Sequence, residues 1–309
     1  MTAGWLGTGK MGTALAHRLL DAGTELAVWN RTASKTAPLT ERGARLVDAP
    51  AELCAQQAVF ITVGGDTDLI EVLSGENGLL DADQAPQVII DCSTVSPETS
   101  AQARELATAA GSNFIAAPIS GNPSVVEAGN AAVVASGPRD VFDTVLPLLD
   151  ILAGTVTWVG AAEHARLVKI CHNLYLGMLA EALVEVTSLA EHSGVDRAAF
   201  LDFLSSSVLG SPWISVRAEA LAQRDLAPTF TLDMLRKDLD LGLDAAGRLG
   251  VPLPSAAIVE QLATVTAGLG HGSADMLALT QLQPKGHHHA DESQHQPESQ
   301  GSGQIHRQA

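Results

Sequence analysis

The sequence predicts an α/β fold in which a doubly wound parallel sheet is followed by an all-helical domain. Short apolar runs alternate with helical patterns through the first half of the chain, which is typical of parallel βαβ units. From residue 164 to about residue 283 only helical patterns recur. Residues 164–194 read as one unbroken helix, roughly three times the average length, and we expect it to join the two domains. We therefore expect domains at residues 1–160 and 161–283 and a tail at 284–309.

The composition excludes several classes of function. The 309-residue chain has 46% hydrophobic residues and a mean hydropathy of +0.16, which is enough for sizeable cores. Its 35 acidic and 18 basic residues give a net charge of −17, which would repel nucleic acid and anionic membranes. Three cysteines without metal-ligand spacing, no signal peptide and no apolar run of about 18 residues predict a soluble cytoplasmic protein.

The first element is a strand that runs through a glycine-rich turn into a helix. Residues 3–6 are apolar, and residues 14–20 trace an apolar helix face that ends at Gly23. The glycines between them are spaced to permit a tight turn, close approach of a pyrophosphate and close helix packing, as a dinucleotide site requires. The expected cofactor-binding residues of this turn are Gly7, Thr8, Gly9, Lys10, Met11 and Gly12.

The second strand, residues 26–29, ends where an NAD enzyme places an acidic residue for the ribose 2′-hydroxyl. This chain has Asn30, Arg31 and Thr32 there, with Lys35 close behind. A guanidinium and a hydroxyl suit a 2′-phosphate, so we expect NADP in preference to NAD. The alternative is that Arg31 is a solvated loop residue.

Three more apolar runs extend the predicted sheet, at residues 58–63, 88–91 and 113–116. Ligands bind such sheets beyond the carboxyl ends of the strands. Thr94, which follows the second of these runs, is therefore a candidate contact for the nicotinamide half of the cofactor. The alternative for Thr94, together with Ser93 and Ser96, is helix capping ahead of Pro97.

The loop at residues 116–123 is rich in Ser, Gly, Asn and Pro. Its backbone N–H groups and the hydroxyl of Ser120, with Gly121 and Asn122 beside it, suit a small carboxylate or phosphate, and a plain rigid turn is the alternative. Two further strands then lead to the long helix, at residues 131–135 and 155–159.

The long helix carries a polar pair next to its apolar face. Lys169 and Asn173 are four positions apart and therefore project together. The apolar face beside them consists of Leu167, Ile170, Cys171, Leu174 and Met178. A lysine that snorkels to the surface is the alternative reading of Lys169.

The helical half contains two aromatic residues beside loops, Trp213 and Phe230. Each is a candidate for lining a substrate pocket, with a core position as the alternative. The tail from residue 284 has hardly any apolar residues, so we expect it to be disordered. Its His287, His288 and His289 lack the spacing of a native metal site, and we expect no metal.

Together these motifs resemble the β-hydroxyacid dehydrogenase family, which includes 3-hydroxyisobutyrate dehydrogenase and tartronate semialdehyde reductase. The resemblance covers about residues 3–283. It rests on six motifs in the family's order, which are Gly7 to Gly12, Asn30 to Thr32, Asp91 to Thr94, Pro118 to Gly121, the pair Lys169 and Asn173, and Lys237 to Leu239.

The resemblance implies a Rossmann domain, a helical domain, and dimers or tetramers assembled through the helices. It implies that Lys169 is the general acid/base, that Asn173 holds the substrate, and that Ser120 with Gly121 binds its carboxylate. Thr94 and Lys237 are the implied cofactor contacts.

The chain departs from the family pattern at four positions. Ala116 stands where an Asp is usual, Asn122 where the second glycine of Ser-Gly-Gly is usual, and Glu163 and Ala165 where glycines are usual. The change at Asn122 could reshape the substrate pocket, and Glu163 could favour the N-terminus of the long helix.

The implied activity is hydride transfer between NADP and the β-carbon of a small 3-hydroxy acid or β-hydroxy amino acid. Lys169 must be neutral to accept the hydroxyl proton, so its pKa must fall by roughly two to three units from ~10.4. An imine reductase and a non-catalytic NADP-binding module are the alternatives. Because loss of the lysine is the usual mark of both, Lys169 argues against each.

Overall fold

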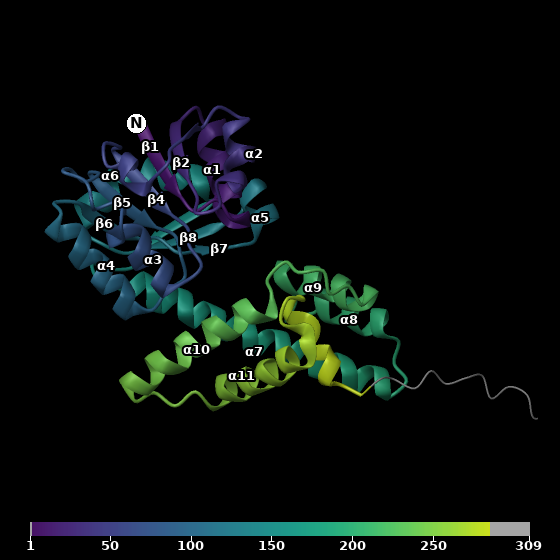
Figure 1. Ribbon diagram of the computed structural model, residues 1–309. Helices are drawn as coiled ribbons and strands as arrows, with labels where there is room; N and C mark the ends of the chain where they lie inside the picture. The colour runs from purple at the N-terminus through teal and green to yellow at the C-terminus, as the bar shows by residue number, and fades with distance from the viewer. Residues whose placement is uncertain (1, 285–309) are drawn as a thin grey trace, which may run out of the picture. The chain divides into compact units, whose positions relative to one another are not determined.

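The computed structural model describes residues 2–284 (Figure 1), and the predictions for the rest of the tail and its three consecutive histidines lie outside the described residues. The chain folds into two compact units. The first comprises residues up to 184 and residues 225–282, and it contains both sheets. The second is built around residues 185–224.

The larger sheet has six parallel strands in the order β3-β2-β1-β4-β5-β6. Its strands are β1 (Thr2–Leu6), β2 (Glu25–Trp29), β3 (Arg45–Leu46), β4 (Ala58–Ile61), β5 (Val88–Asp91) and β6 (Asn113–Ala116). The predicted doubly wound sheet is confirmed, and β3, which the sequence pattern did not predict, is only two residues long. Leu6 at the end of β1 pairs with both Trp29 and Ile61. The strand order reverses at β1, so the carboxyl ends of β1, β2 and β4 meet where such sheets bind ligands.

Alternate side chains of the central strands enter two separate cores, one on each face of the sheet. Trp5 of β1 and Phe60 of β4 stack at 5.0 Å between ring centroids, and they pack with residues of α1 (Lys10–Asp21) and α6 (Arg139–Leu152). Leu6 and Ile61 pack instead with residues of α3 (Asp66–Ser74) and α4 (Pro97–Ala109). The period of two along a strand therefore explains why helices cover both faces.

The strands after β6 form a second sheet, in the order β7-β8-β9. It comprises β7 (Ile119–Ser120), β8 (Ala132–Ala135) and β9 (Thr155–Trp158), with β7 antiparallel to β8 and β9 parallel to it. The predicted strands at 131–135 and 155–159 therefore exist outside the large sheet. The segment Ile119–Ser120, expected to lie in a loop, is a strand because Ser120 pairs with Ala132, a long-range pairing that local pattern does not reveal.

The helical elements confirm the long helix and the absence of extended strands after residue 164 among the described residues. The longer helices are α7 (His164–His192), α8 (Arg197–Ser206), α9 (Pro212–Gln223), α10 (Leu232–Leu249) and α11 (Pro254–Thr266). Shorter helical segments are η1 (Ala33–Thr36), α2 (Ala37–Thr40), η2 (Pro50–Leu53), α5 (Pro123–Glu127), η3 (Ala267–His271) and η4 (Met276–Leu282). Gly194 follows α7 with a φ of +88°, which a glycine adopts readily and which ends the helix as predicted.

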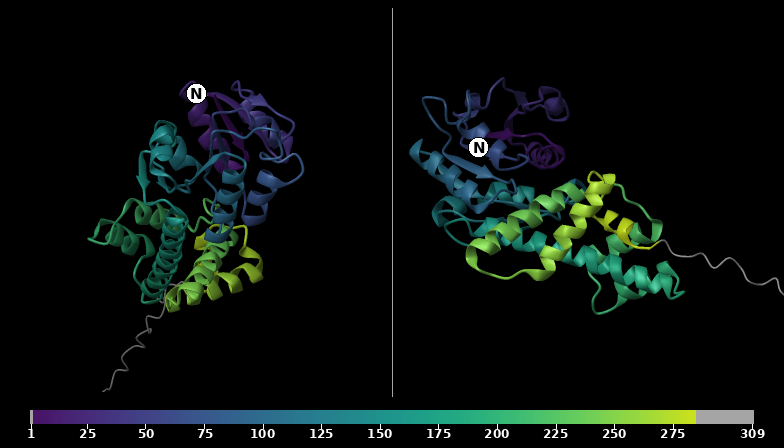
Figure 2. Two further views of the ribbon diagram at one scale, coloured as in Figure 1. Left: turned by 90° about the vertical axis from the view of Figure 1, so that its left-hand side faces the viewer. Right: turned by 60° about the horizontal axis from the view of Figure 1, so that its bottom comes forward.

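Within the first unit, α7 packs closely against α10 and α11 (Figure 2). A Cβ at Gly177 would lie 3.1 Å from Leu235, and a Cβ at Gly242 would lie 2.6 Å from Leu174, so small residues allow the helices to approach. By length and composition alone α7 could cross a membrane, but half of its most apolar stretch is buried in the protein. A core helix meets the same criteria.

Candidate active site

The glycine-rich turn between β1 and α1 has the shape of a phosphate cradle. Gly7 has a φ of +90°, and a Cβ there would lie 2.0 Å from the carbonyl oxygen of Thr62. A Cβ at Gly12 would lie equally close to the Gly7 carbonyl oxygen, whereas a Cβ at Gly9 would meet nothing within 4 Å. The hydroxyl of Thr8 is buried without a hydrogen-bond partner. Open space at Gly9 beside this hydroxyl and a helix N-terminus fits a dinucleotide pyrophosphate.

The end of β2 is tied to this turn through Asn30. Its Oδ1 accepts a hydrogen bond from the backbone N–H of Thr8 at 2.9 Å, and its Nδ2 donates to the carbonyl oxygen of Thr32 at 2.9 Å. Arg31 is exposed, and its Nη1 lies 3.0 Å from Asp68 Oδ1 and 3.5 Å from Glu71 Oε2 on α3. The guanidinium expected to hold the 2′-phosphate is thus paired with carboxylates in this structure.

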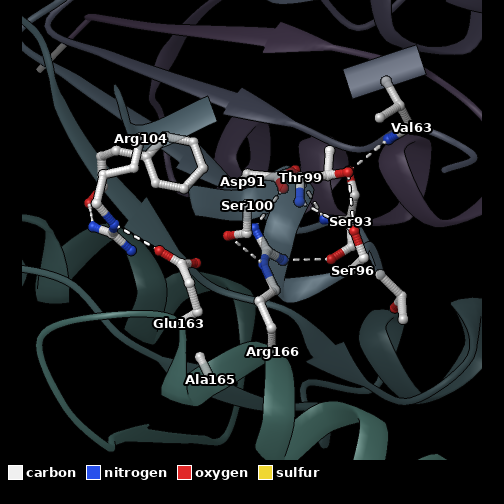
Figure 3. Close-up of polar contacts among 12 residues, drawn as sticks. Val63, Asp91, Ser93, Ser96, Thr99, Ser100, Arg104, Glu163, Ala165 and Arg166 are labelled. Carbon is white, nitrogen blue, oxygen red and sulfur yellow. Dashed lines mark hydrogen bonds and ion pairs between the residues drawn. The ribbon is translucent and has the colours of Figure 1, made fainter. Parts of the chain in front are cut away.

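The end of β5 is held by a buried ion pair (Figure 3). Arg166, in the first turn of α7, places Nη2 2.5 Å from Asp91 Oδ2, and both side chains are almost completely buried. The same guanidinium donates to the carbonyl oxygen of Ser93 at 2.6 Å and to the hydroxyl of Ser100 at 3.0 Å. These contacts attach the start of α7 to the segment that leads to Thr94.

A second ion pair lies beside the first (Figure 3). Glu163, immediately before α7, accepts a hydrogen bond from Arg104 Nε of α4 at 2.8 Å. Arg104 also donates to the carbonyl oxygen of Phe114 at 2.9 Å. Glu163, which stands at a position where the family usually has a glycine, therefore anchors the helix start to the sheet domain.

Lys169 and Asn173 are both buried in α7, so the surface-lysine alternative is wrong. Asn173 Nδ2 donates to Asp238 Oδ2 of α10 at 2.5 Å. The neighbouring Lys237 lies 3.2 Å from Asp238 Oδ1 and donates from Nζ to the carbonyl oxygen of Thr94 at 2.8 Å. Four residues drawn from three separate parts of the chain therefore converge on the site of Lys169.

The environment of Lys169 changes its acidity. Burial lowers the pKa of its amine to about 8, while Asp238 raises that pKa and Lys237 lowers it. Burial outweighs the attraction of the carboxylate because charge in a low-dielectric site loses its hydration. At a pKa near 8 both the neutral and the charged amine are accessible close to neutral pH, which is the property of a general acid/base.

Ser120 faces a residue of α7 as well. Its hydroxyl lies 3.1 Å from Nε2 of His172, and Nδ1 of His172 lies 2.8 Å from Asn173 Oδ1. Asp238, Asn173, His172 and Ser120 thus form one chain of polar contacts, which joins α10 through α7 to β7.

Comparisons with known proteins identify the family of the chain. A family model described as the NAD binding domain of 6-phosphogluconate dehydrogenase matches residues 2–160, and one described as NAD-binding of NADP-dependent 3-hydroxyisobutyrate dehydrogenase matches residues 164–283. The chain belongs to the β-hydroxyacid dehydrogenase family. It is therefore an oxidoreductase with an NAD(P)-binding Rossmann domain.

Individual members of the β-hydroxyacid dehydrogenase family align along most of the chain. Glyoxylate/succinic semialdehyde reductase 1 of Arabidopsis thaliana is 30% identical, covering 90% of this chain and 97% of the relative. The 3-hydroxyisobutyrate dehydrogenase of Pseudomonas aeruginosa is 30% identical with the same coverage. The crystal structure of 3-hydroxyisobutyrate dehydrogenase from Salmonella typhimurium has a TM-score of 0.82 at 26% identity and covers 91% of this chain and 99% of its own.

The structure brings together some of the site residues that the sequence predicts for a β-hydroxyacid dehydrogenase. Thr94 contacts Lys237, and Ser120 reaches Asn173 through His172. Asn122 instead uses Oδ1 to cap α5, accepting hydrogen bonds from Val125 N at 3.0 Å and Ser124 Oγ at 2.7 Å.

Five other predicted residues, and Ser96, have simpler surroundings. Lys10 and Lys35 are exposed and Met11 packs partly against the core. Phe230 precedes α10 and donates its backbone N–H to Asp275 at 3.3 Å. Trp213 belongs to the second compact unit, where its ring lies 5.9 Å from the guanidinium carbon of Arg217. Ser96 caps α4 by accepting from Thr99 N, so the capping alternative is correct for that serine.

Three residues of the site were given no role from the sequence. They are Arg166, His172 and Asp238, and each neighbours a predicted residue in the chain or one helical turn away. Asp238 stands within the motif from Lys237 to Leu239, but only Lys237 was assigned a function there. Their shared signal was a charged or titratable side chain next to Lys169, Asn173 or Lys237. That signal was too weak on its own, because their partners lie on distant elements.

Proposed function

We propose that this oxidoreductase transfers a hydride between NADP and the β-carbon of a small 3-hydroxy acid or β-hydroxy amino acid. The observation that carries the proposal is the buried Lys169, whose pKa is lowered to about 8 and which lies in one polar network with Asn173 and Asp238. When bound, the nicotinamide supplies the hydride acceptor or donor. The glycine turn at residues 7–12 would hold its pyrophosphate.

In the oxidation direction, the neutral amine of Lys169 accepts the proton of the substrate hydroxyl while the hydride leaves the β-carbon. In the reduction direction, the ammonium form returns that proton to the carbonyl oxygen. Asn173 orients the substrate beside the amine, and Ser120 with Gly121 binds its carboxylate. Lys237 fixes the backbone at Thr94, which would contact the nicotinamide half of the cofactor.

The test is a dehydrogenation screen over β-hydroxy acids and β-hydroxy-α-amino acids with NADP at alkaline pH, where Lys169 is neutral. We expect NADPH formation with at least one member, and a loss of several orders of magnitude in kcat for Lys169→Met with unchanged NADPH affinity. A Lys169→Met enzyme within a few-fold of wild type would refute the assignment.

A stability measurement separates loss of chemistry from loss of fold. Because the folded-state pKa of Lys169 lies below its unfolded value, the buried charge destabilises the fold below pH 8, and this penalty shrinks as the pH rises towards 10.5. Lys169→Met should therefore be more stable than wild type at pH 7, by on the order of 2 kcal/mol. An inactive variant that is also less stable would not support a catalytic role.

Two alternatives give different outcomes in the same screen. An imine reductase would reduce cyclic imines with NADPH and leave hydroxy acids untouched, and a non-catalytic module would bind NADPH without turning over either class. The retained, buried lysine favours the dehydrogenase, because a module or an imine reductase has no need of a general base for a hydroxyl proton.

We also propose a cytoplasmic homo-oligomer, a dimer or tetramer assembled through its helices. The support is the apolar surface of α11, where Ile258 and Val265 are exposed and line a shallow cavity of about 360 Å³ with Leu262. Light scattering of wild type and of Ile258→Glu tests it, since a charge in an apolar interface should dissociate the assembly.

A further inference from the structure

The orientation of Asn173 determines where His172 carries its proton. The carboxylate of Asp238, which is paired with Lys237, has only oxygen atoms to offer and therefore accepts hydrogen bonds. The amide of Asn173 therefore turns its NH₂ group towards Asp238, at 2.5 Å, and its oxygen towards His172, at 2.8 Å from Nδ1. An amide oxygen needs a donor, so Nδ1 of His172 carries a hydrogen.

This assignment fixes the opposite side of the ring. In a neutral imidazole with its hydrogen on Nδ1, Nε2 has a lone pair and accepts. The hydroxyl of Ser120, 3.1 Å from Nε2, must then donate its single hydrogen to the histidine. The Ser120 oxygen consequently offers only lone pairs to a molecule that enters from the other side.

A substrate carboxylate accepts hydrogen bonds and donates none. At Ser120 it would therefore face another acceptor, the lone pairs of the hydroxyl oxygen. If the hydroxyl turned its hydrogen to the carboxylate, the lone pairs of Ser120 Oγ and His172 Nε2 would face each other at hydrogen-bond distance, which is unfavourable. A hydrogen on Nε2 removes this conflict, because the ring then donates to Ser120 and Ser120 donates to the carboxylate.

We propose that His172 takes up one proton when a carboxylate substrate binds at Ser120. The proton comes from a buffer acid in the solvent, whose own bond to hydrogen breaks as the N–H bond forms at Nε2, and the resulting imidazolium offsets the negative charge of the substrate. No bond of the substrate forms or breaks. The proposal rests on the proposed function for its choice of Ser120 as the residue that meets the carboxylate.

The charges around His172 set its protonation before the substrate arrives. Partial desolvation lowers the pKa of His172, the hydrogen bond with Asn173 raises it, and the positive charge of Lys169 lowers it again. From α10, Asp238 acts through Asn173 and Lys237 lies beside Asp238, and β7 contributes the uncharged Ser120. The free enzyme at neutral pH therefore has a neutral His172 that is ready to accept a proton.

Lys169 also titrates in this site, so the choice of pH separates the two groups. With a pKa of about 8, Lys169 is already mostly protonated at pH 7 and has little proton left to gain. Uptake of a proton at pH 7 therefore reports on His172. By linkage, the affinity for the carboxylate should fall as the pH rises above 7, by up to about tenfold per pH unit.

Calorimetry of isobutyrate binding to the enzyme with NADP at pH 7 tests the proposal. Isobutyrate has the carboxylate but no hydroxyl to oxidise, and its binding enthalpy in PIPES and in imidazole buffers gives the number of protons taken up. We expect between half and one proton for wild type and none for His172→Asn, which retains a polar side chain. Ser120→Ala should also lose the uptake, although its histidine is intact.

One variant serves as a control for specificity. His164→Asn, which replaces an exposed histidine at the start of the same helix, should keep the proton uptake. Binding of isobutyrate without uptake in wild type, or uptake that persists in His172→Asn, would overturn the role of His172 and leave the proposed function intact. If neither isobutyrate nor any β-hydroxy acid binds, the proposed carboxylate site fails and this proposal fails with it.

Discussion

The side-chain amide of Asn173 donates to the carboxylate of Asp238 over 2.5 Å, although the two residues are 65 positions apart. This contact joins α7 to α10 beside Lys169, and it leaves Asp238 within reach of both lysines of the site. Asp238 raises the pKa of Lys169 and Lys237 lowers it. Burial lowers the pKa of the proposed catalytic amine most, and these two adjacent residues then shift that pKa in opposite directions.

Substitution of these two residues should shift the pH profile of the reaction in opposite directions. In wild type, kcat for oxidation should rise with pH and level off above about 8, because Lys169 must be neutral, and kcat for reduction should fall over the same range. Asp238→Asn should move both curves to lower pH and Lys237→Met should move both to higher pH, each by roughly one unit. Steady-state rates from pH 6 to 10 give the result.

A loss of activity alone would not test this prediction, since both residues also hold neighbouring groups. The decisive observation is the sign of the shift in the two variants. Shifts in the same direction, or an unchanged midpoint in both, would mean that Lys169 is not the titrating group.

The pairing of Arg31 with Asp68 and Glu71 predicts how the cofactor is selected. Removing the guanidinium by Arg31→Ala should lower kcat/KM for NADP by at least about tenfold and change that for NAD little. Asp68→Asn should raise kcat/KM for NADP, because one competitor for the guanidinium is lost. Arg42→Ala is the matched control, since Arg42 is an exposed arginine paired with Asp21 in the same domain. A kcat/KM of wild type with NAD that equals or exceeds the value with NADP would contradict the predicted preference for NADP.

Gly9 and Gly7 should respond differently to alanine. A Cβ at Gly9 has open space and its backbone is extended, so Gly9→Ala should fold with a stability cost below about 1 kcal/mol but lose most of its affinity for NADPH. Gly7→Ala should fail to fold stably, because its Cβ would overlap the Thr62 carbonyl. Gly247→Ala in α10, also in open space, controls for the added methyl group. Thermal unfolding and NADPH fluorescence titration measure both effects, and normal NADPH binding by Gly9→Ala would argue against close approach of the pyrophosphate there.

Arg166 and Asp91 should depend on each other for stability. Arg166→Met leaves a buried carboxylate without its partner and should cost about 3–5 kcal/mol, whereas the double variant with Asp91→Leu should recover most of the loss. The exposed pair Arg139 and Asp143 provides the comparison, since Arg139→Met should cost less than about 1 kcal/mol. Urea unfolding midpoints measure these differences. If Arg166→Met lowered the stability as little as Arg139→Met, the buried pair would not be required for stability.

The parts of the fold that could be predicted from sequence are those formed by residues that are contiguous in the chain. The strand, glycine turn and helix around Gly7 follow one another in the chain, and α7 is continuous from His164 to His192, so local pattern was sufficient. The pairing of Ser120 with Ala132 was missed because a two-residue strand has no periodicity of its own.

The sequence predicted roles for the residues that the family resemblance assigns, and it gave no role to residues whose partners only the folded structure reveals. The contact between Thr94 and Lys237 spans 143 positions, and spacing alone would not have suggested it without the resemblance. The roles of His172 and Asp238 become visible only from the hydrogen bonds that each makes with Asn173. The apolar face assigned to α7 was also partly wrong, since Cys171 is exposed and Lys169 is buried. The reason is that α7 packs on more than one side.

The buried pair of Arg166 and Asp91 also bears on how this enzyme can be divided and recombined. A fragment that stops at residue 160 would keep the carboxylate at the end of β5 and lose the guanidinium that neutralises it. A chimera that joins this Rossmann domain to the helices of a relative would need an arginine at the position of Arg166. The smallest portable module of the cofactor domain therefore extends into the first turn of α7, beyond the point where the sheet ends.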